Sequence, residues 1–267
     1  MRMTNYKYTL KTLSKVILSP RENNAFYSAA GDFNEEDISL GGINIIYPFY
    51  QYGTYEKYEP DNTKYYIPGS SIKGVLLANS SREKTIKMIV DDVEINSDNI
   101  CLDKLKKFQY ISSEITKKAE KEDEQGKEPK IKNFFNNVGV EMLKSNIKVT
   151  GCIFTDDNIK EYLVLANKRT INILNQFKNR IDGIKFNNKD SESFLVREQI
   201  RKNVSGLLKE IEKEDNESYT LILGGYKGLL LSKEFHKDTL NKDFNNAVYL
   251  DLETKLPYGL VTISISK

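Results

Sequence analysis

The order of strand-like and helical segments is the feature that most constrains the fold of this chain. Alternating polar and apolar residues predict strands within Tyr6–Leu18, Val138–Phe154 and Leu256–Ile265. Amphipathic spacing predicts helices over Asp156–Arg180 and Arg197–Lys213. Because strands and helices do not alternate regularly, the pattern favours an α+β fold over a doubly wound parallel sheet. Ferredoxin-like (RRM-like) units, in which helices back an antiparallel sheet with inserted loops, fit this order best.

The domain organisation is set by one unusually polar stretch. Residues 108–137 contain the most polar part of the 267-residue chain, which predicts an exposed insertion. The length allows a single domain over 1–267 or two ferredoxin-like halves, at about 1–107 and 138–267, on either side of that insertion.

Composition excludes several classes of protein. No run of 18 apolar residues exists, and the first residues lack the apolar core of a signal peptide, so we expect a cytoplasmic protein without membrane contact. Cys101 and Cys152 are expected to be reduced thiols in apolar surroundings. A net charge of +2 means that any nucleic-acid site is a local groove. A single histidine, His236, excludes a conventional histidine metal site, and we expect no cofactor.

The string IPGSSIKG, residues 67–74, carries the clearest chemical signal. It offers the hydroxyls of Ser70 and Ser71, free N–H groups at a helix start, Lys73, and the flexible backbone of Gly74. This combination can bind phosphate, although an ordinary helix capped by Ser70 or Ser71 explains it equally well. The Walker spacing GxxxxGK[ST] is absent.

A second glycine-rich string, LGGYKG, follows an apolar strand pattern at residues 223–228. Gly224, Gly225 and Gly228 permit positive φ angles and a close approach of the backbone, and Lys227 adds a cation. A second binding loop and a tight turn remain alternatives.

Three further groups of residues have both a functional and a structural interpretation. The loop acids could hold a divalent ion or form a solvated loop; they are Asp32, Glu35, Glu36 and Asp37. His236 could be a general base for RNA cleavage or a surface residue. The tyrosines of residues 47–58 could stack on bases or serve packing alone.

Several of these strings resemble the RAMP superfamily of CRISPR proteins. Tyr65–Leu77 is similar to its I-P-G-S-S-x-K-G segment, and Leu223–Ser232 is similar to its second glycine-rich loop, in the expected order. Met88–Ile95 and Val138–Phe154 resemble strands that lie between the two motifs in that superfamily. The resemblance implies a ferredoxin-like fold that holds guide RNA with Ser70, Ser71, Lys73, Gly74, Gly224, Gly225, Lys227 and Gly228.

Within the superfamily the chain is most similar to the fifth subunit of the type III-A Csm complex, through its final residues LPYGLVTISI. That resemblance implies a non-catalytic, crRNA-binding subunit that caps the backbone of the complex near the crRNA 3′ end, supports crRNA maturation in antiviral defence, and has other Csm-type subunits as partners. The alternative is the third subunit, a metal-dependent endoribonuclease that cleaves target RNA with a loop aspartate, here Asp32 or Asp37.

Overall fold

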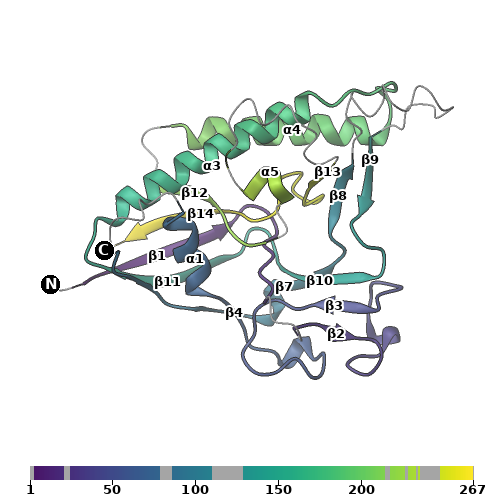
Figure 1. The fold of residues 1–267 in the computed structure, drawn as a ribbon, viewed down its shortest axis with the longest axis horizontal. Helices are drawn as coiled ribbons and strands as arrows, with labels where there is room; N and C mark the ends of the chain where they lie inside the picture. The colour runs from purple at the N-terminus through teal and green to yellow at the C-terminus, as the bar shows by residue number, and fades with distance from the viewer. Residues whose placement is uncertain are drawn as a thin grey trace.

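A five-stranded antiparallel sheet forms the centre of the molecule (Figure 1). The computed structural model describes residues 3–20, 25–78, 86–109, 129–213, 217–225, 228–232, 234 and 247–266. In the central sheet the strand order is β12 (Ser218–Ile222), β14 (Leu260–Ser266), β1 (Thr4–Thr12), β11 (Lys148–Thr155) and β5 (Met88–Val90). All of its pairings are antiparallel, as expected for an α+β fold. The sheet takes strands from both sides of residues 108–137, so the two sequence halves do not form separate sheets.

Three smaller sheets surround the central one. One has the order β2 (Tyr27–Ser28), β3 (Ile45–Tyr47), β10 (Val138–Leu143) and β7 (Ile100–Asp103), and its β3–β10 pairing is parallel. Another has the order β13 (Ala247–Tyr249), β8 (Lys106–Gln109) and β9 (Lys130–Asn133), and the last pairs β4 (Tyr65–Ile67) with β6 (Val93–Ile95). Strands β8 and β9 lie at the two ends of the predicted insertion and pair with each other, and Phe108 is fully buried; residues 110–128 of the insertion lie outside the described residues.

The helices confirm the amphipathic pattern. Helix α3 (Ile159–Asp182) and helix α4 (Glu192–Ile211) begin at the side chains of Asn158 and Ser191, which accept hydrogen bonds from backbone N–H groups of the first turn. The short helices are α1 (Gly69–Leu76) and α5 (Gly228–Ser232), with single 3₁₀ turns at Glu35–Asp37, Pro60–Asn62 and Ser97–Asn99. No helix in the described part of the chain combines the length and the apolarity needed to cross a bilayer.

The main core lies between one face of the central sheet and helices α1 and α3. Its buried side chains include Tyr8, Leu10, Ile153 and Ile263 from the sheet and Ile72, Leu76 and Leu163 from the helices. A second core joins the C-terminal half of α3 to α4. Helix α3 also runs along the edge strand β12, where the Asn167 Oδ1 accepts a hydrogen bond of 2.7 Å from the Thr220 N–H (Figure 1).

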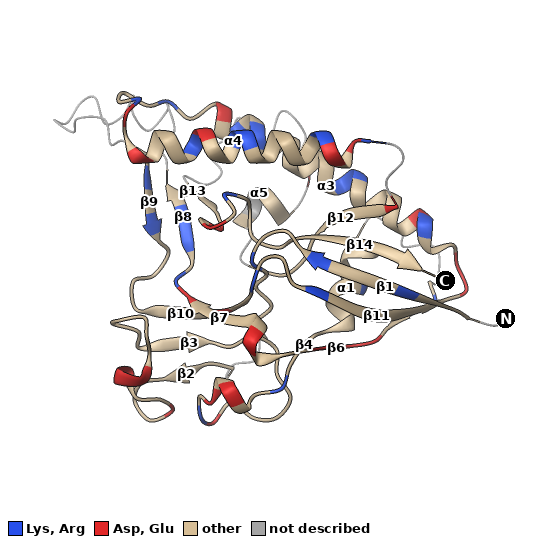
Figure 2. Cartoon of the chain, turned by 180° about the vertical axis from the view of Figure 1, so that it is seen from behind, with Lys and Arg blue, Asp and Glu red and all other residues tan. Residues whose placement is uncertain are grey.

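The two faces of the central sheet have different surroundings. Helices α1 and α5 lie in front of the sheet in Figure 1 and behind it in Figure 2. Helix α4 lies on the opposite side, where the other face of the sheet is open. Along β1 the residues that point to this open face are exposed or half-buried, whereas Tyr8 and Leu10 are fully buried.

Candidate nucleic-acid interface

The first glycine-rich string forms a junction between strand β4 and helix α1. The helix begins at Gly69 with Pro68 as its N-cap, so the expected cap at Ser70 or Ser71 is wrong. Instead, the Asp92 carboxylate, from the turn between β5 and β6, accepts a hydrogen bond of 2.7 Å from the Gly69 N–H. A carboxylate is favourable at this position because the helix dipole presents partial positive charge there. The chain's own anion therefore satisfies the first N–H group of the helix.

Gly69 is required by packing at this junction. A Cβ atom at Gly69 would lie 1.9 Å from the Val90 carbonyl oxygen, a distance that only a shift of the backbone could relieve. This glycine therefore allows helix α1 to sit directly against the end of strand β5. Its presence in the string has a structural explanation that requires no ligand.

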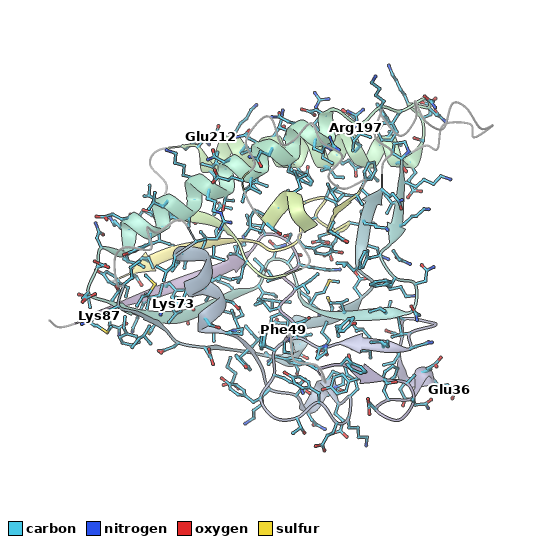
Figure 3. All side chains as sticks on the ribbon, in the orientation of Figure 1. Glu36, Phe49, Lys73, Lys87, Arg197 and Glu212 are labelled. Atoms are coloured by element: carbon cyan, nitrogen blue, oxygen red, sulfur yellow. The ribbon has the colours of Figure 1, made fainter. Side chains whose placement is uncertain are left out.

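The other residues of the string are more accessible. Ser70 and Gly74 are exposed, and Ser71 and Lys73 are half-buried. The Lys73 Nζ donates a hydrogen bond of 2.6 Å to the Met88 carbonyl, which anchors α1 to β5 and leaves its charge without a carboxylate in the described residues (Figure 3). A Cβ atom at Gly74 would meet nothing within 4 Å. Glycine weakens a helix interior, and no neighbouring atom requires a glycine at position 74. The surface of α1 at Gly74 is therefore open to close approach by a ligand.

Tyr66, in the strand that leads into this helix, contacts tyrosine side chains of residues 50–52. The rings of Tyr52 and Tyr66 stack, with centroids 4.4 Å apart and planes at 21°, whereas the Tyr50 ring is tilted by 56° against Tyr66 at 5.8 Å. Tyr52 is 52% exposed, so a base could extend the stack. The tyrosines of residues 47–58 thus divide into two groups: Tyr50 and Tyr52 lie against Tyr66, whereas Tyr55 and Tyr58 pack on the buried Tyr27.

The second glycine-rich string packs its backbone against two other segments. The Gly225 N–H donates to the Ile17 carbonyl at 2.8 Å, and the Leu223 N–H donates to the Gly259 carbonyl at 2.7 Å. Gly224 has a φ of +93°, and a Cβ atom there would lie 2.3 Å from the Ile17 oxygen. Gly224 therefore has a structural role, whereas a Cβ at Gly225 would approach only to 4.0 Å of that oxygen.

The remaining residues of the second string are only partly described. Gly228 begins α5 with a φ of +67°, and a Cβ atom there would lie 3.1 Å from the Tyr249 ring. Lys227 lies outside the described residues, as does His236. Their expected roles therefore stay predictions.

Main-chain hydrogen bonds connect the two strings. The Ile17 carbonyl accepts from the Gly225 N–H, and the carbonyl of the next residue in the chain, Leu18, accepts from the Tyr50 N–H. The Tyr50 carbonyl in turn accepts from the Tyr66 N–H. Each such pairing spans about 4.8 Å, so the connection from the glycine loop to the tyrosine stack covers roughly 15 Å. Since α1 and α5 lie on the same side of the central sheet, both strings belong to one face of the molecule (Figure 1).

The loop acids do not join this face. The Asp32 carboxylate accepts a hydrogen bond of 2.8 Å from the Ser28 N–H and so closes a turn, whereas Asp37 is exposed on the 3₁₀ turn. Glu36, on the same turn, lies at the opposite end of the molecule from Lys73 (Figure 3). No group of three or more potential metal ligands gathers among the described residues. Cys101 and Cys152 are free and half-buried rather than fully buried.

A buried carboxylate that sequence analysis missed lies behind the tyrosine stack. Glu141 is 1% exposed, and its oxygens accept hydrogen bonds from the Tyr65 hydroxyl at 2.6 Å and the Phe49 N–H at 2.9 Å. The Tyr58 hydroxyl is a further donor. Burial raises the pKa of Glu141, and these donors oppose the rise. Its sequence signal was a single charge within the otherwise apolar strand Val138–Leu143.

Comparisons with known proteins find similarity among solved structures only. No protein-family model and no curated protein matches the chain. A chain from the solved "Cryo-EM structure of Csm-crRNA-target RNA ternary complex in type III-A CRISPR-Cas system" aligns with 97% of this chain and 100% of its own length. The sequence identity is 11% and the TM-score is 0.49, so the role of each residue rests on this chain's own geometry.

Proposed function

We propose that this chain is a crRNA-binding RAMP subunit of a type III-A CRISPR (Csm) ribonucleoprotein, which caps the backbone of the complex near the crRNA 3′ end and supports crRNA maturation. The observation that carries the proposal is the Ile67–Gly74 junction. It exposes Ser70 and Gly74 at a helix start beside a partly exposed tyrosine stack. The order of the two glycine-rich strings along the chain, and their location on one face, agree with that role.

The central sheet supports the assignment to a ferredoxin-like fold. In chain order, β1, α1, β5, β11, α3 and β14 follow the β-α-β-β-α-β sequence of that fold. The sheet places these strands as β14-β1-β11-β5, with β12 added at the edge. We propose that these elements form the ferredoxin-like unit of the subunit.

The proposed site contacts the sugar–phosphate backbone of the RNA and does not distinguish its bases. The Ser70 hydroxyl would donate to a phosphate oxygen, and the Lys73 ammonium would add charge while it holds α1 to β5. Gly74 would let the sugar–phosphate chain approach the helix, and Tyr52 would stack on one base. Stacking and phosphate contacts carry little sequence information, so guide–target pairing is left to specify the target.

A copurification from the native cell tests this function. We would tag the full chain, identify copurified RNA by sequencing, and count the subunits by native mass spectrometry. We expect one copy per complex with repeat-derived crRNA. Several copies per crRNA would favour the backbone subunit, and the absence of both RNA and partners would overturn the proposal.

A pair of substitutions tests the site itself. Ser70→Glu places a carboxylate where we propose a phosphate and should reduce the crRNA recovered with the complex. Ser193→Glu is the matched control, since Ser193 also lies in the first turn of a helix, α4. Equal recovery of crRNA with both variants would contradict the proposed site.

The alternative function, target-RNA cleavage, now has one better candidate residue. Asp37 is exposed, whereas the Asp32 carboxylate is engaged with the Ser28 N–H. If the alternative is correct, Asp37→Asn should abolish cleavage by the complex, and Glu36→Gln on the same turn should not. Unchanged cleavage by the complex with Asp37→Asn would contradict a catalytic role of Asp37.

A further inference from the structure

The open face of the central sheet carries positive charge without any carboxylate. Lys7 and Lys11 of β1 and Lys148 of β11 are exposed and point away from helices α1 and α3. None of the five strands contains Asp or Glu. The whole chain has nearly equal numbers of basic and acidic residues, 40 and 38, so this face departs from its composition (Figure 2).

Two of these lysines form an unfavourable pair. Lys11 and Lys148 lie directly opposite each other on neighbouring antiparallel strands. Like charges in this position repel and destabilise a sheet. Within the described residues, Lys7, Lys11 and Lys148 form no ion pair that could relieve the repulsion. The arrangement is unfavourable for the isolated chain, and an external polyanion would offset it.

Hydroxyl groups occupy the space between the lysines. Thr9 pairs with Thr150 on one side and with Ser264 on the other, and Lys11 is flanked by Thr262. Lys7 and Lys11 are about 13 Å apart along the strand. Lysines with interspersed hydroxyls suit phosphate and ribose groups, and no fully exposed aromatic ring lies on the described strands of this face to stack on bases.

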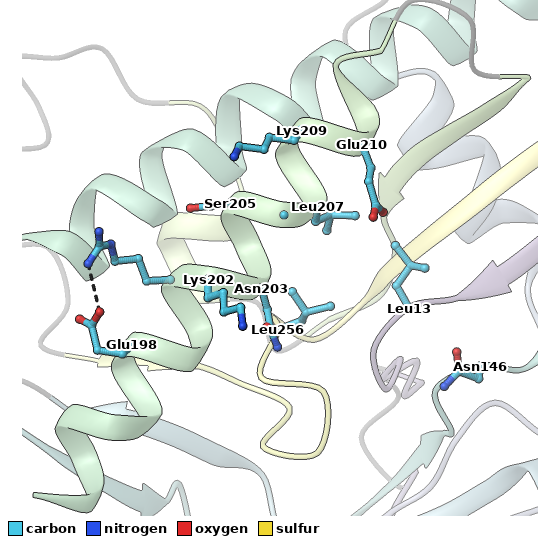
Figure 4. A pocket seen from close by; sticks show the side chains of 12 residues that line it. Leu13, Asn146, Glu198, Lys202, Asn203, Ser205, Leu207, Lys209, Glu210 and Leu256 are labelled. Atoms are coloured by element: carbon cyan, nitrogen blue, oxygen red, sulfur yellow. Dashed lines mark hydrogen bonds and ion pairs between the residues drawn. The ribbon is translucent and has the colours of Figure 1, made fainter.

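A groove continues this surface toward helix α4. It has a volume of about 770 Å³ and begins at Leu13 and Asn146, which follow Lys11 and precede Lys148 in the chain. Lys202, Ser205 and Lys209 of α4 line its other side, together with the carboxylates of Glu198 and Glu210 (Figure 4). Neither of these lysines forms an ion pair within the described residues, whereas the neighbouring Arg201 pairs with Glu198 at 3.1 Å.

Helix α4 also has a glycine without a packing explanation. Gly206 lies in the middle of the helix, is exposed, and lines the groove. A Cβ atom there would meet nothing within 4 Å. As at Gly74, the absence of a side chain leaves room for a ligand backbone to come close.

We infer that the open sheet face and the α4 groove together bind a second segment of single-stranded RNA through its sugar–phosphate backbone. This surface lies on the opposite side of the sheet from the two glycine-rich strings, so it goes beyond the proposed function (Figure 2). An acidic protein is the other polyanion that the charge would accept. The row of hydroxyls and the spread of Lys7, Lys11 and Lys148 along the sheet favour a flexible chain of phosphates.

The test uses the purified full chain, or its complex, with a fluorescently labelled oligouridine RNA at several salt concentrations. Substitution of Lys7, Lys11 and Lys148 by Glu should weaken binding by at least about tenfold and lower the salt slope by about 2, because fewer counterions are released. The matched control changes Lys160, Lys185 and Lys189 to Glu, which alters net charge equally at exposed sites elsewhere. It should bind RNA as the unchanged chain does.

A second variant separates binding from folding. Lys148→Thr should raise the thermal midpoint, because it removes the repulsion with Lys11, while it weakens RNA binding. Unchanged RNA affinity in the triple variant, or equal losses in the triple variant and its control, would overturn the inference. The inference would also be overturned if the triple variant lost a protein partner while its RNA binding stayed intact. Ser70→Glu tests the site on the opposite face. If that variant fails to change crRNA recovery, the proposed function is contradicted, but the result for the lysine variants of the open face still stands.

Discussion

The two glycine-rich strings are held in place by different kinds of interaction. Side chains hold the first: Asp92 satisfies the start of α1, Lys73 anchors the helix to β5, and Tyr65 binds the buried Glu141. Main-chain bonds hold the second, through Gly225 and Leu223. The first string is therefore open to perturbation by charge and pH, whereas the second depends on steric fit.

Both strings nevertheless combine two kinds of glycine. Gly69 and Gly224 lie against carbonyl oxygens that leave no room for a side chain, and Gly74 and Gly225 have space around them. A glycine motif is therefore not a uniform binding signal. Some of its positions build the loop, and only the others are available to a ligand.

The largest expected effect separates the two glycines of the second string. Gly224→Ala should lower the free energy of unfolding by about 3 kcal/mol or more, since the new Cβ meets the Ile17 carbonyl at a positive φ. Gly225→Ala should cost less than about 1 kcal/mol. Chemical denaturation of both variants measures the difference, and equal losses would break the distinction between the two glycines.

The anchor of the first string should respond to the loss of one hydroxyl. Tyr65→Phe removes a donor to the buried Glu141 and should destabilise the chain by about 1–3 kcal/mol. Tyr219→Phe is the control, because the Tyr219 hydroxyl makes no hydrogen bond within the described residues. Thermal unfolding compares them. A negligible effect of Tyr65→Phe would mean that the network does not stabilise this region.

The same network should make stability depend on pH. Burial raises the pKa of Glu141 above its unfolded value, so the folded chain binds this proton more tightly. The contribution of Glu141 to stability is then greatest below the unfolded pKa and declines as pH rises through the folded pKa. Denaturation across pH should show this decline in the unchanged chain relative to Glu141→Gln. An identical pH profile for the two proteins would exclude a raised pKa.

A smaller loss is expected at the start of helix α1. Asp92→Ala removes the acceptor of the Gly69 N–H and should cost about 0.5–2 kcal/mol. Asp91→Ala, in the same turn, should cost less because no cap bond is lost. The comparison of their thermal midpoints tests whether a side chain holds the first string. Equal midpoints would contradict that interpretation.

The smallest effect should have the opposite sign. Gly74→Ala should stabilise the isolated chain by about 0.5–1 kcal/mol, because alanine favours the helix and the site has room. The same substitution should weaken RNA binding if the backbone approaches a ligand here. Unfolding and RNA-binding measurements on one preparation test both parts. Greater stability with unchanged RNA affinity would leave Gly74 without a binding role.

Local patterns predicted much of the fold because some elements express their burial in sequence. The apolar spacing of α3 and α4 located both helices within a few residues. Strands β8 and β9 were not predicted, because their short lysine-rich sequences carry little apolar alternation and form strands by pairing with each other. The start of α1 was misplaced because its cap comes from Asp92, a residue distant in sequence.

The candidate site was predictable in its residue types but not in their roles. The glycines and Ser70 stand out in the sequence, yet which glycine is structural depends on carbonyl groups of Val90 and Ile17 that the fold brings close. Glu141 appeared unremarkable until its burial was known. The open lysine face was not predicted, because Lys11 and Lys148 come together only through strand pairing.

The contact between Asn167 and Thr220 has a consequence for assembly. Because α3 runs along β12 and binds one of its N–H groups, that edge of the central sheet is closed to a strand from a neighbouring molecule. The other edge, β5, is a strand of three residues. The Met88 carbonyl of that strand accepts a hydrogen bond from the Lys73 Nζ, so helix α1 screens part of the second edge as well, and the chain covers both edges of its central sheet with its own helices.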